Sequence, residues 1–156
     1  MKVADVMTKS VRSCAPSCTL NEAAREMWEN DCGVVPVVDT SRTVVGMITD
    51  RDICMAAYTR GRPLNEIPVE QVMARKLLAC RPDSSLTEAE ETMRTAQVRR
   101  LPVTDERGAL VGLITLNDIA RAATAPNGRA AKSPDIKADV VLRTLAGIGE
   151  RRISRR

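Results

Sequence analysis

The chain has 156 residues, a net charge of +4, five cysteines and no histidine, and this length corresponds to one compact domain or to two halves that are small to be stable alone. The missing histidine removes the commonest general base and the usual partner of a serine or cysteine nucleophile, and the cysteines lack the paired spacing of a zinc site, so we expect neither a familiar hydrolase nor a metal centre. No apolar run approaches the ~20 residues of a membrane helix and no apolar signal core opens the chain, so we expect a cytoplasmic protein without membrane contact.

Residues 1–66 contain the first predicted unit, in which short β-branched runs alternate with Ala-rich stretches. Its predicted elements are a short strand over 11–14, a helix from the cap at Thr19 to about Asn30, strands over 34–38 and 44–48, and a helix that begins at Thr49 or Asp50 and ends at Gly61. Thr19 and Glu22 have the spacing of a capping box, which marks where the first helix begins. The order of the elements is β-α-β-β-α.

The same unit occurs again in residues 67–125, without a gap. A shift of 66 positions brings Val6-Met7 onto Val72-Met73 and keeps the same offset through Cys14/Cys80, Leu20/Leu86, Pro36/Pro102 and Asp39/Asp105. One offset at so many positions is not chance, so the chain holds two copies of one unit. Neither copy buries its apolar side alone. We therefore expect a mixed α/β fold whose two small sheets pack together around a shared core.

Residues 126–156 resemble neither copy. Small and turn-forming residues open the segment as a linker, and Ser133-Pro134 is a typical helix start. Apolar residues then recur at helical spacing, namely Ile136, Val140, Val141, Leu145 and Ile148, before a stop at Gly147 or Gly149. This predicts an amphipathic helix whose apolar face covers either its own domain or a second subunit. Four arginines among the last six residues form a basic tail.

A Gly-x-Ile-Thr-x-x-Asp string ends the last strand of each copy, over 46–52 and 112–118. A helix that begins there offers free backbone N–H groups and partial positive charge, which suit a phosphate. The Thr hydroxyl can bind a phosphate oxygen, and the Asp can accept hydrogen bonds from both hydroxyls of a ribose. Helix capping is the alternative interpretation, because Thr and Asp are both good caps. Recurrence in the same position of both copies favours a ligand.

Together with the paired Val-Met, Pro-x-x-x-Leu-x-Glu-Ala and Pro-Val-x-Asp strings, these motifs resemble cystathionine β-synthase (CBS) domains, and two in tandem resemble a Bateman module. The resemblance covers roughly residues 1–124. It implies two nucleotide clefts related by a pseudo-twofold axis. It also implies a homodimer that associates through the helices, with Ile136, Val140 and Leu145 losing exposure if the final helix extends the contact.

The nucleotide contacts that the resemblance implies come from the two strand–helix ends, from the stretch before each Pro-Val and from the segment before the first strand. They are Thr8, Lys9, Gly33, Val34, Thr49, Arg51, Asp52, Val98, Arg99, Arg100, Thr115, Asn117 and Asp118. Thr and Asp contact phosphate and ribose, Arg99 and Arg100 contact phosphate, and the segment at Thr8 contacts adenine. Because the two arginines have no counterpart in the first copy, we expect the Asp118 cleft to bind an adenosine nucleotide more tightly than the Asp52 cleft, although Arg51 places a cation in the latter.

The leading functional hypothesis is a stand-alone regulatory module that binds AMP, ADP, ATP or S-adenosylmethionine and signals to an unknown effector protein or through self-association. It needs no cofactor and carries no catalytic residue. The alternative is a nucleic-acid-associated regulator that uses the Arg-rich tail. Against this alternative, the chain has one Trp, one Tyr and no Phe for base stacking. A metabolic enzyme is the third hypothesis, and no nucleophile–base pair supports it.

Overall fold

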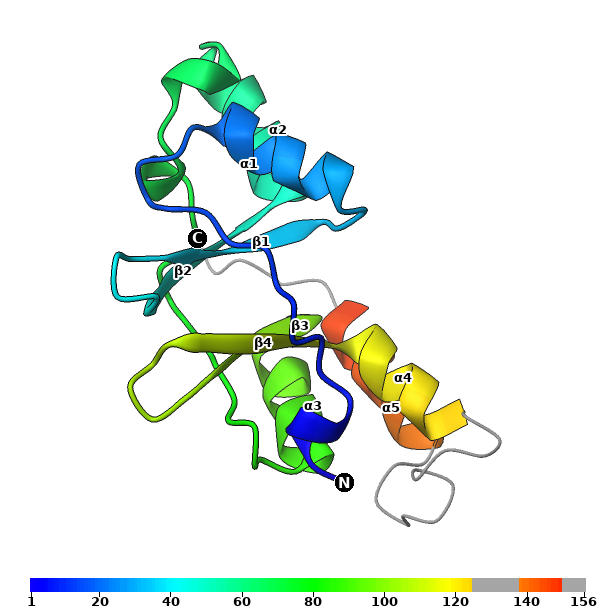
Figure 1. Cartoon of the computed structure of the whole chain (residues 1–156). Helices are drawn as coiled ribbons and strands as arrows, with labels where there is room; N and C mark the ends of the chain where they lie inside the picture. The colour runs from blue at the N-terminus through cyan, green and yellow to red at the C-terminus, as the bar shows by residue number, and fades with distance from the viewer. Residues whose placement is uncertain (125–137, 150–156) are drawn as a thin grey trace. The chain divides into compact units, whose positions relative to one another are not determined.

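The computed structural model describes residues 1–124 and 138–149, and its elements follow the two copies in order (Figure 1). They are η1 (Val3–Asp5), α1 (Leu20–Glu29), β1 (Val34–Val38), β2 (Val44–Thr49), α2 (Asp50–Arg60), η2 (Leu64–Glu66), η3 (Val69–Gln71), α3 (Leu86–Ala96), β3 (Arg100–Thr104), β4 (Leu110–Thr115), α4 (Leu116–Thr124) and α5 (Ala138–Gly149). The fold is therefore mixed α/β, as the sequence predicts. None of the helices in these residues is long and apolar enough to cross a bilayer.

The helices begin where the capping residues predict. Thr19, Thr49 and Ser85 each accept a hydrogen bond from the backbone N–H three residues on, and a Glu or Asp side chain at that position binds back to the cap. Each box satisfies backbone donors that the first helical turn leaves without partners. At the other end of α2, Gly61 adopts a left-handed φ of 57°, which glycine tolerates best.

The strands form two antiparallel pairs, β1 with β2 and β3 with β4. The strand predicted over 11–14 is reduced to one parallel bridge between Cys14 and Val37, and Cys80 makes the equivalent bridge to Val103. The Cys14 N–H donates to the Pro36 carbonyl at 3.1 Å, and its carbonyl accepts from Val38 at 2.9 Å. Pro16 follows two residues later and cannot donate to a ladder, so the pairing stops after one residue.

The chain divides into two compact units that do not follow the boundary between the copies. One unit consists of Met1–Lys9, Leu78–Val103 and the chain from Val111 onward, and the other consists of Ser10–Leu77 and Thr104–Leu110. The first nine residues thus belong with the second repeat. Residues 67–77, which open the second copy in sequence, belong with the first repeat. The boundaries predicted from the sequence, at 66 and 125, stay a prediction.

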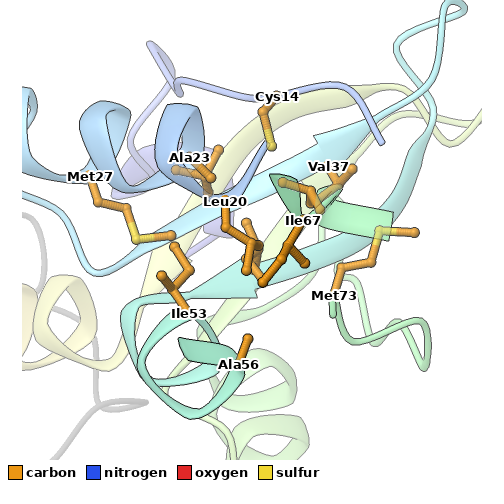
Figure 2. Close-up of a cluster of buried hydrophobic side chains, with 12 residues drawn as sticks. Cys14, Leu20, Ala23, Met27, Val37, Ile53, Ala56, Ile67 and Met73 are labelled. Atoms are coloured by element: carbon orange, nitrogen blue, oxygen red, sulfur yellow. The ribbon is translucent and has the colours of Figure 1, made fainter. Parts of the chain in front are cut away.

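Each unit has its own cluster of buried side chains. In the Ser10–Leu77 unit, Leu20, Ala23 and Met27 of α1 meet Ile53 and Ala56 of α2 over the strands (Figure 2). Ile67, Val69 and Met73 enter the same cluster from the chain after α2. The other unit repeats the arrangement with Leu86, Ala89, Met93 and Ile119, and Val3 of the N-terminal segment takes the place that Val69 has in the first cluster. A core shared between the two sheets stays a prediction.

The last described helix, α5, covers its own domain. It packs on α3 and lies beside α4 (Figure 1), and Val141 joins the buried cluster there. The buried Thr144 hydroxyl donates to the Glu90 carboxylate, and Gln97 Nε2 donates to the Gly147 carbonyl at 3.1 Å. The sequence allowed the apolar face of this helix to cover either its own domain or a second subunit. The structure shows that it covers its own domain. The predicted start at Ser133-Pro134, the side chain of Ile136 and the arginine tail lie outside the described residues.

Candidate functional site

The strand–helix end of the first repeat, which we call joint 1 (Thr49–Asp52), is closed by its own side chains. Thr49 donates its backbone N–H and its hydroxyl to Asp52 Oδ2, at 3.0 and 2.7 Å. The Asp52 N–H donates back to the Thr49 hydroxyl at 3.1 Å. The next amides are also satisfied, because Asp50 N–H donates to the Gly33 carbonyl and Arg51 N–H donates to Asp50 Oδ1. The capping interpretation of this motif is therefore confirmed.

Joint 2 (Thr115–Asp118) has the same geometry in the other unit. The Thr115 N–H and hydroxyl donate to Asp118 Oδ2 at 2.9 and 2.6 Å, and the Asp118 N–H donates to the hydroxyl at 3.2 Å. The Leu116 N–H donates to the Arg99 carbonyl at 2.9 Å. Capping does not exclude a ligand, because each carboxylate has about four acceptor sites and the box occupies two of them on one oxygen.

The glycine that opens each Gly-x-Ile-Thr-x-x-Asp string lies in the strand just before each joint and lets another segment cross that strand closely. A Cβ on Gly112 would lie 2.6 Å from Met7 Sδ and 3.0 Å from the Thr8 carbonyl oxygen, and a Cβ on Gly46 would lie 2.4 Å from Met73 Sδ. Thr8 exchanges two backbone hydrogen bonds with Leu113, both 2.9 Å long. Ala74 pairs in the same way with Met47. The glycine of the motif is therefore needed for close approach rather than for a positive φ.

The two joints differ at the second oxygen of the aspartate. Asp118 Oδ1 accepts an ion-paired hydrogen bond from Arg121, whose side chain is 76% exposed. Met55 occupies the equivalent position of the first repeat, and no described residue donates to Asp52 Oδ1. Asp52 also lines a cavity of about 280 Å³. Both acceptor sites of Asp52 Oδ1 can therefore take a vicinal diol, whereas Arg121 already holds one side of Asp118 Oδ1.

The joints also differ in charge at the first helical turn. Asp50 in joint 1 adds a carboxylate that caps the Arg51 amide, but the equivalent Leu116 is buried and carries no acceptor. The stretch before β3 adds two arginines, Arg99 exposed and Arg100 half-buried. Joint 2 therefore has one carboxylate fewer in its first helical turn and two arginines before its strand, whereas joint 1 has Arg51 in that turn and Arg60 beside Asp52.

The structure places the predicted site residues in two separate groups, each within one unit. Gly33 and Val34 adjoin joint 1, since Val34 pairs with Thr49, and the Val34 side chain is buried. The other predicted residues of joint 1 are Arg51, exposed, and Asp52, half-buried. The group at joint 2 contains Thr8, Lys9, Val98, Arg99, Arg100, Thr115, Asn117 and Asp118.

Sequence reasoning missed the segment that crosses joint 1. Ala74 lies against Met47 as Thr8 lies against Leu113, so the exposed Arg75 and Lys76 follow at the place that Lys9 takes in the other unit. The sequence could have identified this segment, because the offset of 66 positions brings Thr8-Lys9 onto Ala74-Arg75. Arg75 donates to the Glu70 carbonyl at 3.0 Å, so this cation is held near η3.

The fold and the doubled joint define a class of proteins built from two α/β repeats, each with a capped strand–helix end. A family model described as "CBS domain" matches residues 3–58 and 69–125. The chain therefore belongs to the CBS domain family, as the resemblance implies.

Relatives and solved structures agree with this assignment. The chain is 39% identical over 118 residues to the CBS domain-containing protein YhcV of Bacillus subtilis (strain 168), covering 76% of this chain and 82% of that protein. The crystal structure of the CBS domain pair of protein MJ0100, in complex with 5′-methylthioadenosine and S-adenosyl-L-methionine, matches with a TM-score of 0.71 and 26% identity over 78% of this chain and 94% of that one. The crystal structure of CBSX2 in complex with AMP matches with a TM-score of 0.70 and 28% identity, covering 78% and 95%.

Proposed function

We propose that the chain is a regulatory CBS pair that binds an adenosine-type compound at each joint and passes the signal to an effector protein. It acts in the cytoplasm, as a homodimer, without catalysing a reaction. The observation that carries the proposal is the repetition of one joint geometry, with a buried or half-buried aspartate at the start of a helix in both units. The adenosine compounds held by CBSX2 and MJ0100 support this class of ligand.

The proposed roles follow from the groups left available at each joint. Asp52 and Asp118 accept the ribose hydroxyls on Oδ1. Phosphate at joint 2 binds to the side chains of Arg99, Arg100 and Asn117. The Thr hydroxyls stay in their capping boxes and hold the aspartates in place, so a phosphate contact from Thr49 or Thr115 requires the hydroxyl to turn away from the carboxylate.

Different ligands should therefore prefer different joints. Joint 2 has the arginines and lacks the extra carboxylate of Asp50, so it suits phosphate-bearing nucleotides such as AMP and ATP. Joint 1 has a carboxylate oxygen to which none of the described residues donates, and an acidic first turn, so it suits adenosyl compounds without phosphate, such as 5′-methylthioadenosine or S-adenosylmethionine. For nucleotides that carry a phosphate, this division agrees with the order of affinity expected from the sequence, in which the Asp118 cleft binds more tightly than the Asp52 cleft. For ligands without a phosphate, it reverses that order.

Thermal unfolding with a panel of adenosine compounds tests the proposal. A ligand at 100 times its dissociation constant stabilises the folded state by about 2.7 kcal/mol, which shifts the midpoint by several degrees. AMP, ADP, ATP, S-adenosylmethionine and 5′-methylthioadenosine are compared with GMP and with inorganic phosphate as controls. A shift by at least one adenosine compound without an equal shift by the controls is expected. No shift by any of them overturns the ligand part of the proposal.

A further inference from the structure

The second repeat contains a groove between α3 and α5 that the proposed nucleotide binding does not use. The two helices pack on each other within one unit (Figure 1), and the groove between them has a volume of about 720 Å³. Two carboxylates, two guanidinium groups and two apolar side chains are among its lining groups, namely those of Glu90, Glu91, Arg94, Arg143, Val140 and Ala146. Neither joint aspartate lines it, so the groove is separate from both joints.

Glu90 has a buried carboxylate without a cation of its own. It is 7% exposed, and among the described residues only the Thr144 hydroxyl donates to it. The nearby Arg94 is held by Glu91, at 2.6 Å. The hydrogen bond to Glu91 is the main cause that raises the pKa of Arg94, and the charge of Glu90 is the smallest. A buried carboxylate is costly unless a cation or further donors compensate it, so Glu90 favours a positively charged ligand.

The docking of α5 does not require this negative charge. A glutamine at position 90 would accept a hydrogen bond from Thr144 as a glutamate does, and burial of an amide costs less than burial of a carboxylate. The fold of the repeat does not require the charge either, since the offset of 66 positions places Ala24 at the equivalent position. The charge of Glu90 is therefore best explained by a cationic group that binds in the groove.

Arg143 supplies the opposite charge from the other helix. It lies three residues after Val140 and four before Gly147, and all three line the groove on the α3 side of α5. Its contact with Asp139 is 4.0 Å long, and the two side chains are 80% and 58% exposed, so this ion pair contributes little. Glu91 and Arg94 neutralise each other. One carboxylate and one guanidinium thus remain for a ligand that carries both charges.

We propose that the groove between α3 and α5 binds a free α-amino acid with an uncharged side chain. Its ammonium group pairs with Glu90 and its carboxylate pairs with Arg143, and both contacts are charge-assisted hydrogen bonds. Val140 and Ala146 offer apolar surface to an aliphatic side chain. Because the two charges come from different helices, the bound amino acid links α5 to α3 and stabilises the docking of α5. The site goes beyond the proposed function and does not rest on it.

Thermal unfolding with neutral amino acids is the first test. Glycine, L-alanine, L-leucine, L-methionine and L-threonine are compared at about 10 mM, a concentration at which a ligand of millimolar affinity stabilises the folded state. The controls are the corresponding amine and the corresponding carboxylic acid, which for leucine are isopentylamine and isocaproate. At least one amino acid should raise the unfolding midpoint, and neither of its single-charge analogues should do so equally.

Two substitutions each remove one charge from the groove. Glu90→Gln keeps an acceptor for the Thr144 hydroxyl, and Arg143→Gln changes an exposed side chain. Each should weaken the binding of the active amino acid at least about tenfold in calorimetric titration, because each removes hydrogen bonds to a charged group. Asp83→Asn and Arg107→Gln remove the same charges at exposed positions outside the groove, and both should leave the affinity unchanged.

The other outcomes overturn the proposal. If none of the amino acids shifts the midpoint, the groove does not bind this class of ligand. If the amine alone acts as strongly as the amino acid, the groove is a site for a simple cation. If the parent and both charge variants bind equally, the amino acid binds elsewhere. Should Glu90→Gln lose helical signal in circular dichroism, Arg143→Gln decides, because its side chain is exposed. A shift by nucleotides without a shift by amino acids would remove this proposal alone.

Discussion

The aspartates of the two joints share their backbone contacts and differ in the groups around the second carboxylate oxygen. This difference predicts opposite effects for two matched substitutions. Asp118→Asn should weaken AMP more than Asp52→Asn does, whereas Asp52→Asn should weaken 5′-methylthioadenosine more. Each loss should be ~1.5–3 kcal/mol, the size of hydrogen bonds to a charged group. Calorimetric titration measures both, with the exposed Asp83→Asn as a control.

Asparagine is the better replacement because it keeps an oxygen for the Thr N–H of each capping box. Alanine would also remove the acceptor that the aspartate gives to the capping box, and so would lower helix stability as well. Equal losses of both ligands in both variants would contradict the division of roles between the joints.

Replacement of Arg121 is expected to raise the affinity of joint 2 for 5′-methylthioadenosine. Its guanidinium pairs with the buried Asp118 carboxylate, so a ribose that uses both sites of Oδ1 must displace it. Arg121→Met installs the residue that the first repeat has at the equivalent position, Met55. It should tighten 5′-methylthioadenosine binding at joint 2 several-fold, and titration against the Asp52→Asn background isolates that joint. An unchanged or weaker affinity would show that Arg121 does not compete with the ligand.

The buried cysteines predict how stability depends on alkaline pH. Burial raises the pKa of Cys14 to about 12 and that of Cys80 to about 11, from ordinary values of 9.0. Above about pH 9 the unfolded chain therefore loses these protons while the folded chain keeps them. The free energy of unfolding should be unaffected by these thiols below pH 9. It should fall as pH rises to about 11–12, by at most about 1.4 kcal/mol per pH unit for each thiol.

Urea unfolding at pH 8, 9 and 10 measures this slope. The Cys14→Ala/Cys80→Ala variant is less stable at every pH because it leaves two small cavities, but its slope between pH 9 and 10 should be flatter. If the free energy of unfolding fell equally steeply between pH 9 and 10 in parent and variant, groups other than these two thiols would control stability at alkaline pH.

At the scale of elements, the sequence predicted helix starts and the second and third strands well, because local chemistry sets them. Thr19, Thr49 and Ser85 carry their capping boxes within four residues of chain. The strand over 11–14 was predicted too long, since its extent depends on how many residues of a distant partner stay in reach. Composition could not show that pairing ends after Cys14.

The glycine in the strand before each joint predicts a packing penalty when a larger residue replaces it. Gly112→Ala places a Cβ 3.0 Å from the Thr8 carbonyl oxygen, and backbone cannot move aside as a flexible side chain can. We expect a loss of ~1–3 kcal/mol of stability, as in other overpacked sites, together with weaker binding at joint 2. Gly149→Ala meets nothing within 4 Å and is the matched control. Thermal unfolding would contradict the prediction if both variants matched the parent.

At the scale of the whole molecule, the offset of the repeat predicted the equivalence of the two joints, and the resemblance of the paired motifs predicted the family. It also placed each Thr and Asp of the motif correctly relative to the strand end, because motif and geometry repeat together, and their binding of a ligand stays a prediction. It could not show that residues 1–9 and 67–77 belong with the opposite repeat. Sequence order suggests the reverse, and only tertiary contacts such as Val69 N–H to the Cys18 carbonyl, at 2.7 Å, reveal it.

Because residues 1–9 and 67–77 each belong with the opposite repeat, we can predict which fragment around the first repeat folds alone. Residues 1–66 end before Ile67, Val69 and Met73, which are 0, 0 and 7% exposed in the first core cluster. Losing one such side chain costs ~2–5 kcal/mol, and a unit of this size has little stability to lose. Residues 10–77 keep all three and omit the nine residues that belong to the other unit. Circular dichroism should therefore show cooperative thermal unfolding for fragment 10–77 and none for fragment 1–66. Cooperative unfolding of fragment 1–66 would mean that the segment after α2 is dispensable to the core it enters.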